Sequence, residues 1–134
     1  VTVRYGKPSG SDAVRISPAD VEANMKGKGP QAGSAVTGRH GGRFTNFGDY
    51  AYNLFQHIDL HGNPPSRALF DVVAVAVLKN PAWGEKSEGP APRLVNNQWQ
   101  EQPGNARKMT VWENFDSEGI IRDFYDRMEN YVLR

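Results

Sequence analysis

The fold of this 134-residue chain is decided by the stretch Ala68-Leu69-Phe70-Asp71-Val72-Val73-Ala74-Val75-Ala76-Val77-Leu78, an apolar run that contains one carboxylate. Its length favours a helix over a buried strand, although its valines are also typical of strands. Lys79-Asn80-Pro81 follows the run as a helix end. An ionised group in apolar surroundings needs a counter-charge or a metal ion. Asp71 is therefore either an exposed first-turn residue favoured by the helix dipole, or a cation ligand or active-site carboxylate.

Three further helices are predicted around this run. Ser17-Pro18-Ala19-Asp20 combines an N-cap serine, a proline at the first helical position and an acid three residues after the cap, so a helix is expected from there to about Lys26. Residues 47 to 58 carry apolar side chains at helical spacing. Asp116-Ser117 begins a last amphipathic helix.

Short strands are predicted between these helices and after the apolar run. Residues 1 to 5 and 13 to 16 are expected to be strands, and so are residues 108 to 112. Residues 93 to 95 and 98 to 100 flank Asn96-Asn97, which predicts a β-hairpin with a tight turn. Helices and strands alternate in the first half of the chain, and the hairpin is inserted before the last helix. The expected fold class is therefore α/β.

Length and composition narrow the function classes. Residues 1 to 134 suffice for a single domain or for part of a larger one, and the opening of the chain inside a predicted strand leads us to expect a fragment or a processed product. The net charge of +1 predicts no strong attraction to nucleic acid or to an anionic membrane. The absence of cysteine excludes disulfides and thiolate metal sites. The longest apolar run is about half the length of a membrane span.

Several polar and aromatic residues have both a functional and a structural interpretation. Residues 27 to 43 are expected to form a long loop, and the basic part from Arg39 to Arg43 is either a phosphate contact or lid, or simply a solvated loop. His57 and His61 are four residues apart, which suits a metal pair as well as two surface histidines. Tyr50 and Tyr52 are either packing residues or stacking platforms for a nucleobase.

The apolar run also resembles part of a known enzyme family. Leu69 to Ala76 is similar to the late helix of the inosine-uridine-preferring nucleoside hydrolases, where a His-Asp-Pro-like start precedes apolar residues. Met109 to Trp112 resembles a strand near the C-terminus of that family, and residues 120 to 129 resemble its closing helix. The similarity spans nearly the whole chain but only the C-terminal portion of the family.

The resemblance implies a fold, a reaction and a metal ion. The fold would be the C-terminal part of an open sheet with flanking helices and a small β-hairpin insertion. The family cleaves the N-glycosidic bond of nucleosides to a base and a sugar, and it uses a calcium ion. By position, Asp71 is the implied calcium ligand, and a nucleoside or related ribosyl compound is the implied substrate. Self-association of the chain into a homo-oligomer is a further expectation, because a truncated sheet exposes an unpaired edge.

Two substitutions separate this chain from the family pattern. Phe70 stands where many members have a histidine that protonates the leaving group, and Val72 stands where they have a proline. His40, in the glycine-rich loop, is the candidate replacement acid, and Tyr50 and Tyr52 are the candidate base-binding residues. The N-terminal aspartate cluster of the family does not occur in these residues, so we expect the isolated chain to be inactive. The alternatives are a non-catalytic binding module and a degenerate hydrolase-like protein.

Overall fold

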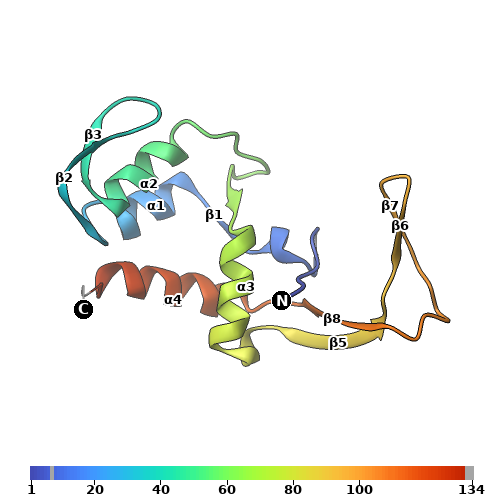
Figure 1. The fold of residues 1–134 in the computed structure, drawn as a ribbon. Helices are drawn as coiled ribbons and strands as arrows, with labels where there is room; N and C mark the ends of the chain where they lie inside the picture. The colour runs from blue at the N-terminus through green and yellow to red at the C-terminus, as the bar shows by residue number, and fades with distance from the viewer. Residues whose placement is uncertain (7, 132–134) are drawn as a thin grey trace.

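The computed structural model describes residues 1–6 and 8–131, which contain both helices and short strands (Figure 1). The helices are α1 (Pro18–Met25), α2 (Phe47–Phe55), α3 (Phe70–Lys79) and α4 (Ser117–Glu129), with two short 3-10 helices, η1 (Ser11–Ala13) and η2 (Pro81–Trp83). The strands are β1 (Arg15–Ile16), β2 (Gln31–Thr37), β3 (Arg43–Asn46), β4 (Arg67–Ala68), β5 (Glu85–Pro90), β6 (Arg93–Val95), β7 (Gln98–Gln100) and β8 (Lys108–Glu113). None of the described helices has the length and apolar character needed to cross a lipid bilayer.

The strands pair in four antiparallel, two-stranded sheets: β1 with β4, β2 with β3, β5 with β8, and β6 with β7. The mixed α/β class is therefore confirmed. The β6–β7 hairpin has the predicted register around Asn96 and Asn97, whose φ angles of 49° and 60° are those of a tight hairpin turn. The described residues form two-stranded sheets and no continuous open sheet.

The core consists of two adjoining clusters that the β1 segment joins. Ile16 packs with residues of α1, α2 and α4, including Val21 and Met128. Val14 lies two residues earlier and packs with Val73 of α3 and with α4. Because α3 buries only one side against these neighbours, Asp71 in its first turn is exposed although Val73 is buried. This packing fixes the start of α3 relative to β1 and β4.

The capping interactions predicted from the sequence are present at the starts of α1 and α4. At α1, the Ser17 hydroxyl accepts a bond from the Asp20 backbone N–H at 3.2 Å, and the Asp20 carboxylate accepts one from the Ser17 N–H at 2.9 Å. This reciprocal pair satisfies two backbone donors that a helix start otherwise leaves unpaired. The Asp116 side chain caps α4 in a similar way, by accepting a bond from the Gly119 N–H at 2.9 Å.

Two of the predicted segments were wrong. The expected loop of residues 27 to 43 contains strand β2, which pairs with β3 across a register shift. The small side chains of β2 are mostly exposed on both faces, so no period-two pattern marked it as a strand. The expected strand of residues 1 to 5 is reduced to a single parallel bridge between Val3 and Trp112.

A projecting arm, defined here as strands β5 to β8 with their connections, extends away from the four helices (Figure 1). Its tip carries Trp99, which is 72% exposed, and Leu94, which is 53% exposed. The chain has an accessible surface of 9097 Å², whereas a compact monomer of its mass is expected to have about 7,000 Å². The fold therefore presents more surface than a compact domain of this size.

The Tyr125 hydroxyl is buried in α4 without a hydrogen-bond partner among the described residues. Burial, with a smaller contribution from the Asp20 carboxylate, raises the pKa of Tyr125 above its ordinary value of 10.0. The unfolded chain therefore ionises this tyrosine at a lower pH than the folded chain does, so stability falls as the pH rises above about 10. We expect Tyr125→Phe to leave the free energy of unfolding at pH 7 unchanged or to raise it by about 1 kcal/mol. The variant should also lose less stability than the unaltered protein when the pH rises above about 10. Urea unfolding at pH 7 and pH 11 measures both effects, and a clear destabilisation at pH 7 would contradict the absence of a partner.

Candidate functional site

Asp71 is exposed and lies in the first turn of α3. The opposite side of the helix is buried through Val73, Ala76 and Val77. No hydrogen bond or ion pair connects the Asp71 carboxylate to another described residue, and the N-cap residue Leu69 offers no side-chain cap. Asp71 therefore occupies the exposed first-turn position that one of the two interpretations describes, and its role as a cation ligand stays a prediction. This position favours a negative charge and leaves the carboxylate available to a ligand.

A cavity of about 520 Å³ opens beside the start of α3, and we call it the Phe70 cavity. The residues that line it are Tyr5, Asp12, Arg15, His61, Arg67, Ala68 and Phe70. The Tyr5 and Phe70 rings form one wall, with centroids 5.5 Å apart and planes inclined by 35°. The volume lies in the range of small-molecule sites, and an aromatic wall with a few polar groups is typical of them.

Arg15 holds the polar side of the Phe70 cavity together. Its side chain is only 14% exposed and is paired with the Asp12 carboxylate at 2.5 Å. It also donates to the Ser66 hydroxyl and to the Ser66 carbonyl, both at 2.9 Å. These bonds join η1, β1 and the segment before β4, so the charge of Arg15 is already compensated and its role is structural.

Arg67 and His61 are lining residues whose side chains still have hydrogen-bonding groups available to a ligand. The Arg67 Nη1 donates to the Asp59 carbonyl at 3.1 Å, and no carboxylate of a described residue forms an ion pair with this guanidinium. His61 is exposed, and its backbone is held by a pair of 3.0 Å bonds with Ser66. The lining of the cavity therefore includes one arginine without a carboxylate partner among the described residues, and one imidazole.

The residues of this chain do not fit a calcium ion on their own. The described part of the chain contains no group of three or more histidine, aspartate or glutamate residues placed to hold a metal. Calcium takes 6–8 oxygen ligands, and Asp71 supplies one carboxylate. His57 and His61 are both exposed, as in the interpretation of two surface histidines, and they have different neighbours: His57 stacks on His40, whereas His61 lines the Phe70 cavity.

His40 lies in the connection between β2 and β3, where its ring stacks on His57 with centroids 4.8 Å apart and planes inclined by 2°. The Nδ1 atom of His57 is 2.7 Å from the Asn53 carbonyl oxygen. His40 is not among the residues that line the Phe70 cavity. Its role as the replacement acid stays a prediction.

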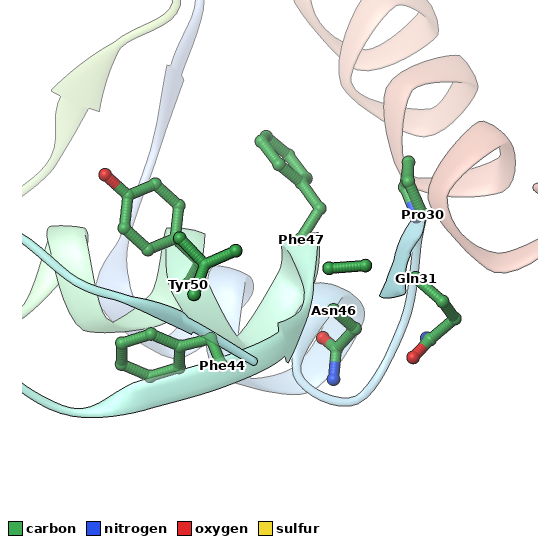
Figure 2. Close-up of a pocket in the computed structure, with 8 residues that line it drawn as sticks. Pro30, Gln31, Phe44, Asn46, Phe47 and Tyr50 are labelled. Carbon is green, nitrogen blue, oxygen red and sulfur yellow. The ribbon is translucent and has the colours of Figure 1, made fainter. Parts of the chain in front are cut away.

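Tyr50 and Tyr52 lie on different sides of α2. Tyr50 lines a separate apolar pocket of about 250 Å³ between α2 and the β2–β3 hairpin, where it meets Phe44 edge-on at 5.8 Å (Figure 2). Tyr52 packs against the core, and the Lys26 ammonium lies 5.0 Å from the centre of its ring. Neither tyrosine lines the Phe70 cavity, so both have packing roles here, and a substrate role stays a prediction.

Comparison of the chain with protein-family models, with curated proteins and with solved structures finds no match. The functional interpretation consequently rests on the sequence resemblance and on the geometry around α3. Arg67 and Tyr5 were missed by sequence reasoning, since neither belongs to a recognisable motif. The only local signal was the position of Arg67 shortly before the apolar run.

Proposed function

We propose that this chain is the C-terminal segment of a calcium-dependent hydrolase that cleaves the N-glycosidic bond of ribonucleosides to a base and a sugar. The observation that carries the proposal is the exposed carboxylate of Asp71, which immediately follows the aromatic wall of a ligand-sized cavity. The resemblance of residues 69 to 76 to the late helix of the nucleoside hydrolases supports the same placement.

In this proposal, the chain supplies part of the site and the rest of the complete protein supplies the remainder. Tyr5 and Phe70 would contact the base, because aromatic faces stack well on nucleobases. Asp71 would contribute one oxygen ligand to the calcium ion, whose charge helps to hold sugar hydroxyls. The remaining ligands would come from outside these residues, so the isolated chain is expected to be inactive.

The pairing of β1 with β4 is compatible with the open sheet of this proposal. In the described residues, each of these short strands has one hydrogen-bonded neighbour. Their outer edges therefore offer backbone groups to further strands. The large accessible surface of the chain supports the same idea, because added protein would cover part of it. A homo-oligomer would cover it as well.

His61 is the histidine that we propose as the proton donor to the leaving base, since Phe70 cannot donate a proton and His61 lines the same cavity. General acid catalysis contributes about 10²–10⁴-fold. We expect His61→Gln to lower the kcat of the complete protein for inosine by about 100-fold or more and to remove one limb of its pH profile. His40→Gln distinguishes the two candidate acids, because it should leave kcat unchanged if His61 is the proton donor. A loss of activity in His40→Gln alone would instead favour the histidine of the β2–β3 connection.

The projecting arm favours a second candidate function, a non-catalytic interaction module. Trp99 and Leu94 are paired across the β6–β7 hairpin and are both exposed, so together they offer an apolar contact surface at the tip of the arm. Ribose release discriminates between the two functions. A folded complete protein that binds calcium but turns over neither inosine nor uridine would favour the interaction module or a degenerate hydrolase.

A further inference from the structure

We infer that the Phe70 cavity selects a nucleoside monophosphate over the uncharged nucleoside, with the phosphate held by Arg67. This inference deepens the proposed function, because it rests on the assignment of the cavity to a nucleoside. It concerns the substrate class, which the resemblance leaves at uncharged nucleosides.

The charge balance of the cavity carries the first step. The lining residues include one carboxylate, Asp12, and two guanidinium groups. The Asp12 carboxylate forms an ion pair with Arg15 at 2.5 Å, and Arg15 also donates a hydrogen bond to the Ser66 hydroxyl. Arg67 is left half-buried, with a single bond to the Asp59 carbonyl and no carboxylate partner among the described residues. A cation in this situation attracts an anion, and a planar guanidinium fits phosphate oxygens through paired donors.

The position of Arg67 relative to the aromatic wall carries the second step. Arg67 and Phe70 are three residues apart, so their Cα atoms are at most about 11 Å from each other. The base of a nucleotide can therefore lie against Tyr5 and Phe70 while its phosphate lies within reach of the Arg67 guanidinium. The cavity volume of about 520 Å³ accommodates a ligand of this kind.

The position of His61 carries the third step. Its imidazole lines the same cavity, and its backbone is tied to Ser66 next to Arg67. A bound phosphate would find a second donor there, because an imidazole carries an N–H even when neutral. The site thus combines an aromatic wall with a positively charged side, which is the combination that a monophosphate of a nucleoside requires and an uncharged nucleoside does not use.

Binding to the 134-residue chain tests the inference, because every lining residue lies in this chain. Titration calorimetry with EDTA present would compare uridine 5′-monophosphate with uridine. We expect the monophosphate to bind at least about ten-fold more tightly. Inorganic phosphate should compete with it, which is a readout on the unaltered protein. Arg67→Gln should abolish the preference, whereas Arg93→Gln, an exposed arginine on the arm, should retain it.

Equal affinities for uridine and its monophosphate, no binding of the monophosphate, or an unchanged preference in a folded Arg67→Gln variant would each overturn the inference. These outcomes are separate from the test of the proposed function. Turnover of uncharged nucleosides by the complete protein without a preference for the monophosphate would leave the hydrolase proposal standing and this inference refuted. Tight binding of the monophosphate to the chain, without turnover by the complete protein, would support this inference and refute the hydrolase proposal.

Discussion

Replacing Asp71 by alanine is expected to lower kcat/KM for ribose release by the complete protein by at least about 100-fold. Loss of a residue that merely orients a metal ligand costs about 10–100-fold, so loss of a ligand itself should cost no less. Asp71→Asn keeps the shape of the side chain but removes its charge, and it should lose most of the activity as well. Initial rates with inosine and uridine measure the effect.

The stability of the protein should change little in the same variant. Asp71 is exposed and makes no bond to a described residue, so alanine removes only its interaction with the helix N-terminus, about 0.3–1 kcal/mol. Thermal unfolding followed by circular dichroism checks this. Asp126→Ala, which removes an exposed acid from α4, is the matched control and should retain full activity. Full turnover in Asp71→Ala would remove Asp71 from the site.

Gly48→Ala is expected to lower the free energy of unfolding by about 3 kcal/mol, which corresponds to a melting temperature lowered by roughly 10 °C. Gly48 is buried in the first turn of α2, and its N–H donates to the Lys28 carbonyl at 2.9 Å. A Cβ atom there would lie 2.7 Å from that carbonyl oxygen and still closer to the Met25 carbonyl oxygen. Because both obstacles are backbone atoms, α1 and α2 would have to separate.

Gly33→Ala is the control for this effect. Gly33 lies in β2, and a Cβ atom at that position would meet nothing within 4 Å. Urea unfolding of the two variants should show a large loss for Gly48→Ala and almost none for Gly33→Ala. Equal stabilities would contradict the close approach of α1 and α2 on which the first core cluster depends.

The elements that sequence reasoning predicted correctly are those with local signals. The Ser17–Asp20 capping box, the Asn96-Asn97 turn and the length of the apolar run each specify structure within a few residues. Strands β2 and β5 had no such signal. β2 is mostly exposed on both faces, and β5 reads Glu-Lys-Ser-Glu-Gly-Pro, so neither has the apolar alternation of a strand. These two segments are strands because they pair with β3 and β8, and their composition does not indicate a strand.

The site was less predictable than the fold. Sequence reasoning singled out Asp71 and left its exposure open, and the structure decides for exposure. The Phe70 cavity was not predicted, because its lining residues come from segments far apart in the sequence. The β1–β4 pairing brings Arg15 and Arg67 together, and Tyr5 comes from a third segment near the N-terminus. The same long-range placement distinguishes His61, which lines the cavity, from His40, which stacks on His57.

Ribose release from inosine and uridine, measured on the complete protein with calcium present and again after chelation, is the most direct test of the nucleoside hydrolase assignment. The assignment predicts release of free base and ribose that stops on chelation and is restored by added calcium. A folded, calcium-loaded protein that releases no ribose, or one whose release is indifferent to chelation, would contradict it.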